Sequence, residues 1–106
     1  MEAEIDYREL VPPVVNTAAE TQLMAQVCTE LVGEENVITK VPRGFAGSED
    51  FAWMLDALPG CYLLLGNGEG EFGGCMVHNP GYDFNDQVLP LGAACWVRLA
   101  QTYLVA

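Results

Sequence analysis

Proline and glycine divide this 106-residue chain into short segments, and this division is the strongest limit on its fold. Pro12-Pro13, Gly33 and Pro59-Gly60 each interrupt an otherwise regular stretch. A Pro-Pro pair removes backbone donors and favours an extended connector, while glycine readily ends a helix. Each segment is long enough for one helix or one strand, and none approaches the roughly 18 apolar residues that span a bilayer. We therefore expect one small domain with a modest core.

The first helical segment begins with a capping motif. Thr17-Ala18-Ala19-Glu20 fits a capping box, in which Thr17 accepts an amide hydrogen from the first turn and Glu20 reaches back. Gly33 is well placed to end this helix. The residues expected on its buried face are apolar and lie three or four positions apart: Ala19, Leu23, Met24, Val27, Cys28 and Leu31.

Two further segments have the signals of helices. Ser48 can cap the second, where Glu49 and Asp50 place negative charge at the positive end of the helix dipole. Its expected buried stripe consists of Phe51, Met54, Leu55 and Leu58. The third helix is expected from about residue 89 to residue 104, with Pro90 in its opening turn. Its expected inward face consists of Trp96, Leu99, Ala100, Tyr103 and Leu104.

Three other segments have the pattern of β-strands. Residues 2–8 alternate between apolar and charged side chains, which indicates a half-buried strand. Residues 37–41 form a short β-branched run. Residues 61–65 are apolar throughout, as expected for a central strand covered on both faces. Because helices and strands alternate along the chain, we predict an α/β fold in which helices cover a sheet.

The charge balance excludes some classes of partner. Four Lys and Arg residues stand against 15 Asp and Glu residues, which gives a formal net charge of -11. Such a chain repels a phosphate backbone and the anionic face of a membrane, so neither nucleic acid nor membrane is an expected partner. The amino terminus lacks the basic-then-apolar pattern of a signal peptide, so we expect a cytoplasmic location.

The cysteines are spread singly along the chain among apolar neighbours, at Cys28, Cys61, Cys75 and Cys95. This spacing differs from that of disulfide-stapled small proteins, so we interpret them as reduced residues in or near the core. The alternative is a structural zinc site built on the Cys75-x-x-His78 spacing, which needs two further ligands from elsewhere in the fold.

A glycine-rich segment runs from Gly66 to Asp86 and contains the only histidine of the chain, His78. Six of the 11 glycines lie between Gly66 and Gly81. A loop of this length in so small a domain is usually either functional or disordered. A lone histidine is more often a surface or hydrogen-bonded residue than a metal ligand, and the pattern by itself leaves both interpretations open.

Short motifs follow one another in a set order across nearly the whole chain. They are Tyr7-Arg8, Pro12-Pro13-Val14-Val15-Asn16, Gly47-Ser48-Glu49-Asp50-Phe51, Pro59-Gly60 with Leu65-Gly66, and His78-Asn79-Pro80 with Tyr82-Asp83-Phe84-Asn85-Asp86. In order and spacing, these motifs resemble the carboxy-terminal half of the aminoacylase and hippurate hydrolase family of dinuclear metallopeptidases.

This resemblance implies an amidohydrolase that cleaves N-acyl amino acids such as benzoylglycine with the help of two divalent ions, zinc or manganese. In that family the histidine of the His-x-Pro motif binds one of the ions, and the matching residue here is His78. The resemblance also places Ser48 and Glu49 near the substrate. Asn16 resembles a hinge residue whose side chain reaches the cleft, which makes it a third candidate for substrate binding.

The resemblance also implies a domain division. Residues 1–11 correspond to the last strand of a lid or dimerisation domain that is otherwise missing, and residues 12–16 correspond to the hinge. Residues 17–106 correspond to the carboxy-terminal part of the catalytic domain. The implied fold class is therefore a partial three-layer α/β/α sheet domain preceded by one strand of the lid.

The ligands of a dinuclear site are mostly absent from this sequence. Two ions need several carboxylate and imidazole ligands and a carboxylate that takes a proton from the bridging water. Glu34-Glu35 fits a solvated turn after Gly33 better than a metal site. We identify no candidate catalytic residue and expect the isolated chain to be inactive. The alternative is a non-catalytic α/β association module, since an unpaired strand edge and exposed apolar surface favour homo-oligomers.

Overall fold

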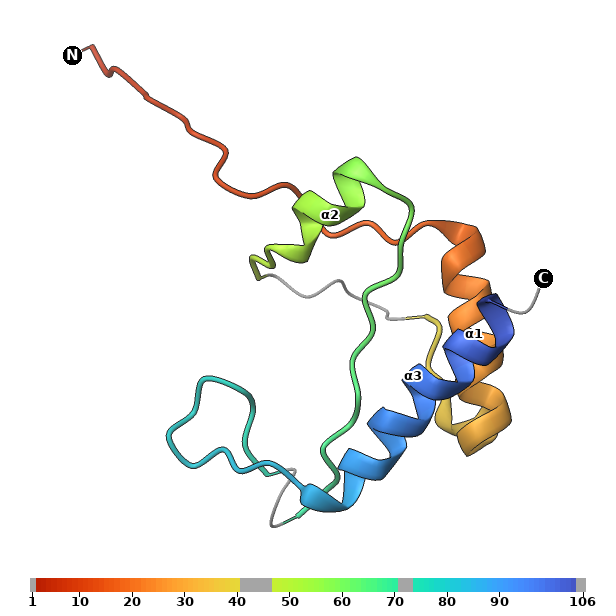
Figure 1. The fold of residues 1–106 in the computed structure, drawn as a ribbon. Helices are drawn as coiled ribbons and strands as arrows, with labels where there is room; N and C mark the ends of the chain where they lie inside the picture. Colours follow the sequence, from red (N-terminus) through yellow and green to blue (C-terminus); the bar gives the residue numbers. More distant parts are fainter. Residues whose placement is uncertain (1, 41–46, 71–73, 105–106) are drawn as a thin grey trace.

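The computed structural model describes residues 2–40, 47–70 and 74–104. Helices are the regular elements of this part of the chain (Figure 1). In order they are α1 (Ala18–Val32), the short 3-10 helix η1 (Glu34–Asn36), α2 (Phe51–Ala57), the 3-10 helix η2 (Asp86–Val88) and α3 (Leu89–Tyr103). The three predicted helices are therefore present, and extended segments connect them.

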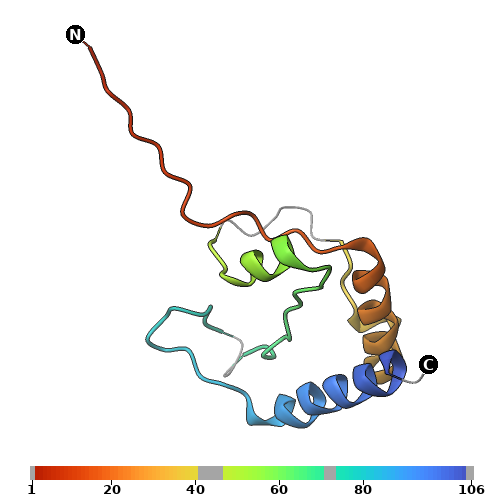
Figure 2. The ribbon, with the colours of Figure 1, turned by 45° about the horizontal axis from the view of Figure 1, so that its top comes forward.

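Helices α1 and α3 lie side by side in both views and form the main helix–helix contact of the described residues (Figures 1 and 2). Met24 and Val27 on α1 are buried, and Val27 is fully enclosed at 0% exposure. Both residues belong to the predicted apolar face of the first helix, so the 3.6-residue periodicity identified the correct side. The core of the described residues lies along this contact and under α2, where Ala52 is also buried.

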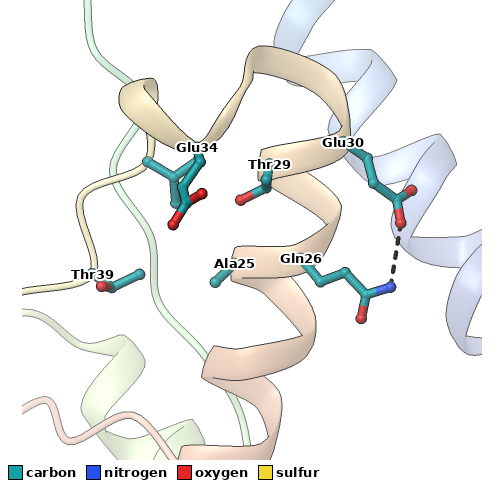
Figure 3. A pocket seen from close by; sticks show the side chains of 7 residues that line it. Ala25, Gln26, Thr29, Glu30, Glu34 and Thr39 are labelled. Carbon is teal, nitrogen blue, oxygen red and sulfur yellow. Dashed lines mark hydrogen bonds between the residues drawn. The ribbon is translucent and has the colours of Figure 1, made fainter.

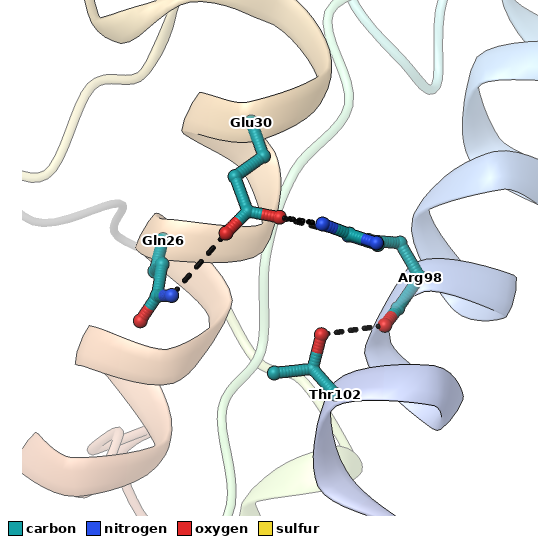
Figure 4. Close-up of polar contacts among 4 residues, drawn as sticks. All are labelled: Gln26, Glu30, Arg98 and Thr102. Atoms are coloured by element: carbon teal, nitrogen blue, oxygen red, sulfur yellow. Dashed lines mark hydrogen bonds and ion pairs between the residues drawn. The ribbon is translucent and has the colours of Figure 1, made fainter. Parts of the chain in front are cut away.

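A polar contact joins the outer edges of α1 and α3 (Figure 4). Both Nε and Nη2 of Arg98 donate to Oε2 of Glu30, at 2.8 and 2.5 Å. Gln26 Nε2 donates to the other carboxylate oxygen of Glu30 at 3.2 Å. The neighbouring Arg98 guanidinium lowers the pKa of Glu30, with a smaller contribution from Gln26. Because the pair is largely exposed, it sets the register of the two helices more than it stabilises them.

The two ends of α1 follow the sequence signals with one difference. Gly33 adopts a φ of 85° and its amide donates to the Thr29 carbonyl at 2.9 Å, so it ends the helix as predicted. At the start, Thr17 is the N-cap residue, but its side chain accepts no amide hydrogen from the first turn. The Thr17 hydroxyl instead donates to the Glu20 carboxylate and accepts from the Gly60 amide at 3.0 Å. The hydrogen bonds predicted for the capping box are therefore wrong, because the Thr17 hydroxyl accepts the amide hydrogen of Gly60 and not one from the first turn of α1.

Helix α2 begins later than predicted, since Asp50 and not Ser48 is its N-cap residue. Ala52 is buried, and Phe51 and Leu55 are half-buried. The prediction that Met54 and Leu58 are buried is wrong, because their side chains are 63% and 72% exposed. A helix of seven residues has room for only a narrow contact face, so the outer part of the expected stripe faces away from the described chain.

Helix α3 has nearly the predicted bounds, with Pro90 in its first turn. Its predicted inward face is mostly wrong: Trp96, Tyr103 and Leu104 are exposed, while Leu99 is half-buried. The face that meets α1 instead carries Cys95, whose sulfur contacts Met24. Helix α3 has apolar side chains on two of its faces, and the described residues cover only the face that meets α1.

The three predicted strands are not formed in the described residues. Residues 2–10 are exposed and extend away from the rest of the chain (Figure 1). Residues 37–40 and 61–65 are also without strand pairing, and Val41 lies outside the described residues. The sheet of the predicted α/β fold is therefore not observed, because a strand needs a neighbour to receive its backbone hydrogen bonds and the described segments provide none.

The described chain is open compared with a typical domain. Its radius of gyration is 17.4 Å, whereas a compact domain of this length has about 13 Å. Large apolar side chains on α2, on α3 and in the segment 62–65 remain exposed. None of the described helices has both the length and the apolar character needed to cross a bilayer. Apolar surface on this scale is typical of a face that packs against further protein.

Candidate functional site

Asn16 joins the start of the folded region to the extended segment that follows α2. Its Nδ2 donates to the Tyr62 carbonyl at 2.8 Å, and its Oδ1 accepts from the Tyr62 amide at 2.8 Å. The side-chain amide thus pairs with the backbone as a neighbouring strand would. The adjacent Thr17 extends this pairing, because its amide donates to the Gly60 carbonyl at 3.0 Å. Asn16 therefore fixes where the segment after α2 leaves the helix.

Glu49 is held at the same place through the side chain of Tyr62. Its Oε2 accepts from the Tyr62 hydroxyl at 3.0 Å, and its Oε1 accepts from the Phe51 amide at 3.2 Å. The Phe51 and Tyr62 rings also contact each other, with centroids 5.5 Å apart. The Phe51 amide, followed by the Tyr62 hydroxyl, lowers the pKa of Glu49, and the same carboxylate raises the pKa of Tyr62. Glu49 is therefore ionised at neutral pH and Tyr62 is protonated.

These shifts predict how stability depends on pH. The folded chain lowers the pKa of Glu49 below its usual value of 4.5, so its contribution is fully present above that value and is lost as the pH falls through the folded pKa. In Glu49→Gln, we expect a shallower loss of thermal stability between pH 5 and pH 3. The control is Glu9→Gln in the exposed amino-terminal segment. Circular dichroism measures the melting temperature of each variant at each pH. If melting temperature depended on pH equally in both variants, the role assigned to Glu49 would be contradicted.

Ser48 lies just before Glu49 and is exposed. Because α2 begins at Phe51 with Asp50 as its N-cap residue, the Ser48 hydroxyl is not used to cap the helix. It precedes a carboxylate that is already bound to Tyr62. Of the three predicted substrate-binding residues, Asn16 and Glu49 are therefore brought together on Tyr62, and Ser48 adjoins them along the chain.

His78 occupies a tight turn whose backbone conformation is unusual. The Asn79 amide donates to the Met76 carbonyl at 3.3 Å, which places His78 at the third position of the turn. Its φ is 69°, and it is the only residue other than glycine with a positive φ in the described part of the chain. Glycine and asparagine favour such a position, and histidine is one of the few other residues that adopt it. The imidazole is exposed and has no hydrogen-bond partner among the described residues.

Two asparagines close the loop that carries His78. Asn67 Nδ2 donates to the Asp83 carbonyl at 2.8 Å, and Asn67 Oδ1 accepts from the Asn85 amide at 2.9 Å. Asn85 Oδ1 in turn accepts from the Gln87 amide at 3.1 Å, which caps the 3-10 helix η2. The sequence interpretation missed this closure, although an asparagine at each side of a glycine-rich segment was a visible signal. The two asparagines fix the base of the loop against the start of α3.

The loop that carries His78 and the start of α2 lie on one side of the molecule. In both ribbon views, residues 74–85 and the start of α2 are on the side of the extended segment 58–68 that is opposite α1 (Figures 1 and 2). No contact joins His78 to Asn16, Ser48 or Glu49 within the described residues. The described residues therefore give His78 and the Tyr62 cluster as two separate groups.

Two hollows of the described surface lie away from the predicted site residues. The larger one has a volume of about 380 Å³ and follows α1 and the segment after η1, where Thr29, Glu34 and Thr39 line it (Figure 3). A smaller hollow of about 200 Å³ lies between Pro12-Pro13 and α2. None of the predicted site residues lines either hollow.

The described residues contain no group of three or more His, Cys, Asp or Glu side chains placed to hold a metal ion. The alternative of a zinc site on Cys75 and His78 therefore receives no further ligands from this part of the chain. Glu34 and Glu35 lie in the exposed helix η1 after Gly33, as the sequence predicted. The four cysteines are free and half-buried, which agrees with their predicted positions in or near the core.

Comparison with known proteins gives a consistent result. The model of peptidase family M20/M25/M40 matches residues 2–102. The IAA-amino acid hydrolase ILR1-like 2 of Arabidopsis thaliana is 36% identical over 97 residues, which cover 92% of this chain and 22% of that protein. The hippurate hydrolase of Campylobacter jejuni is 29% identical over 104 residues, which cover 98% of this chain and 26% of that protein.

A third similar protein is the putative amidohydrolase YhaA of Bacillus subtilis, which is 30% identical over 94% of this chain and 25% of its own length. The chain thus spans about a quarter of the length of these curated relatives and matches their carboxy-terminal part. No solved structure matches.

Proposed function

Since the chain belongs to peptidase family M20/M25/M40 and is a hydrolase family member, we propose that it forms the carboxy-terminal segment of a metal-dependent amidohydrolase that cleaves N-acyl amino acids. Peptidases of this family are generally metal-dependent. The substrate class is supported by relatives named for the hydrolysis of hippurate and of IAA-amino acids. The choice of zinc or manganese rests on the mixed imidazole and carboxylate ligands that such a site requires.

The observation that carries this proposal is the backbone of His78. A histidine in a left-handed conformation costs free energy that the surrounding chain must supply, and such strain often accompanies function. The turn leaves the imidazole exposed on a loop whose base is fixed by Asn67 and Asn85. An imidazole held in this way suits a divalent ion as a single ligand. His78 is therefore the residue of this chain that would hold one of the two ions.

The other proposed roles follow from the hydrogen bonds around Tyr62. The Ser48 hydroxyl, which α2 does not use, is the proposed direct contact to the substrate. Asn16 binds the backbone of Tyr62 and Glu49 binds its hydroxyl, and we propose that both side chains line the substrate side of the cleft. The bound ions would polarise the scissile carbonyl and activate a water molecule. The groups that complete the site, including the base that accepts the proton, lie outside this chain.

A chimera tests the proposed activity. The matching 26% of the Campylobacter jejuni hippurate hydrolase would be replaced with this chain, which aligns to it over 98% of its length. We expect the purified chimera to bind divalent metal and to hydrolyse benzoylglycine. A folded chimera that contains the normal amount of metal but does not cleave benzoylglycine would contradict the proposal.

The exposed apolar surface supports a second candidate, an association module without catalysis. Trp53 on α2 and Trp96 on α3 are both more than half exposed, and such surface favours self-association. Self-association, measured by light scattering after size exclusion, is expected of an association module and equally of an enzyme segment with the same exposed surface. Hydrolysis by the chimera decides between them.

A further inference from the structure

Two cysteines meet where α1 and α3 pack together. Cys28 on α1 and Cys95 on α3 are 67 positions apart in the sequence, and their Sγ atoms are 3.9 Å apart. The Cys95 sulfur also lies 3.8 Å from the Sδ atom of the buried Met24. Both cysteines are half-buried, so small solutes can reach them while their neighbours hold them in place. Neither thiol has a role in the proposed hydrolase site.

We propose that Cys28 and Cys95 form a site of reversible oxidative cross-linking, at which a disulfide joins α1 to α3. A disulfide bond is about 2.05 Å long, so the two sulfurs must approach each other from their present 3.9 Å. The helices already lie in contact, and the new bond would link elements near the two ends of the folded region.

The oxidant in this proposal is a low-molecular-weight disulfide such as oxidised glutathione. One cysteine thiolate attacks a sulfur of this disulfide, forms a mixed disulfide and releases one glutathione thiolate. The second cysteine thiolate then attacks the protein sulfur of the mixed disulfide and releases the second glutathione thiolate. The two protons lost by the protein are taken up by the two glutathione thiolates, so the protein is oxidised by two electrons and glutathione is reduced by two.

The surroundings of Cys28 give this reaction a pH dependence. Burial, assisted by the neighbouring Cys95, raises the pKa of Cys28 to about 11. Since only the thiolate is nucleophilic, Cys28 reacts slowly at neutral pH. The groups that raise its pKa also include Cys61, which lies on the segment after α2 and is the main competing partner. Cross-linking should therefore become faster between pH 7 and pH 9, and Cys95 should remain the preferred partner.

Mass spectrometry of the glutathione-treated chain tests the proposal. We expect an intact mass lower by two hydrogens and a peptide pair that joins Cys28 to Cys95. The cross-linked chain should melt about 10 °C higher than the reduced chain, since the bond closes a long loop of the unfolded state. Cys28→Ser and Cys95→Ser should each lose the product. Cys75→Ser is the matched control and should retain it, because Cys75 lies in the loop near Gly81.

Repeating the reaction in urea shows whether the folded structure directs it. We expect the Cys28–Cys95 product to dominate in native buffer and to fall to a statistical share of all cysteine pairs when the chain is unfolded. Stable glutathione adducts without a cross-link would overturn the proposal. A Cys28–Cys61 product as the major species, or equal product distributions with and without urea, would also overturn it.

Discussion

Replacement of His78 with alanine in the hippurate hydrolase chimera is expected to reduce benzoylglycine hydrolysis by at least about 100-fold. Residues that only hydrogen-bond to a metal ligand cost up to about that much when they are mutated, and a ligand should cost no less. The chimera should also lose part of its bound metal. The measurement is the initial rate of benzoylglycine cleavage at saturating zinc or manganese, together with the metal content of the purified protein.

A second variant separates the imidazole from the backbone that carries it. Asparagine tolerates the left-handed conformation observed at position 78, so His78→Asn should preserve the turn between Met76 and Asn79. We expect His78→Asn to be folded and as inactive as His78→Ala. If His78→Asn retained most of the activity, the histidine would serve the turn and would not be a metal ligand.

Replacement of Val27 with alanine is expected to destabilise the described core. Val27 on α1 is fully enclosed, and few other side chains of the described residues are buried. Removal of its methyl groups should cost about 2 kcal/mol from the lost burial and the remaining cavity. For a domain of this size, the melting temperature should fall by roughly 10 °C. Circular dichroism of the reduced chain measures it.

The matched control is the same substitution on the exposed side of α3. Val97 is 57% exposed, so its truncation removes little buried surface. Alanine is also the better helix former, and Val97→Ala should therefore change stability by no more than about 0.5 kcal/mol. If the two variants melted at the same temperature, the contact between α1 and α3 would not be the core of this chain.

Local signals in the sequence predicted the helices well. The three- and four-residue spacing around Met24 and Val27 identified the buried face of α1, and Gly33 gave its end. These features depend on hydrogen bonds within one helix and on one packed neighbour, so residues close in sequence determine them. The exposed turn at Glu34-Glu35 was predicted for the same reason.

Features that depend on distant partners were not predictable in the same way. The segment 61–65 has the composition of a central strand, yet the described chain offers it no strand to pair with. Likewise Trp96 and Tyr103 have the spacing of a buried face, but the described residues leave them exposed. A sequence pattern shows that a side chain suits a protein interior, and it does not show which part of the protein covers it.

The candidate site shows the same limit at the level of single residues. The motif around Ser48, Glu49 and Asn16 was visible, but nothing in it indicated that Tyr62 would bind two of these side chains. The positive φ of His78 was also invisible, because a histidine in a left-handed turn has no sequence signature. The contacts of Tyr62 arise only when segments separated in sequence meet.

The most direct test of the account is the hydrolysis of benzoylglycine by this purified chain alone, with zinc or manganese added. His78 is proposed to supply one metal ligand, and the described residues do not assemble the remaining ligands. We therefore expect a rate no higher than that of the metal ion without protein. Metal-dependent turnover by the isolated chain that disappears in His78→Ala would show that the site is complete here and would contradict the account.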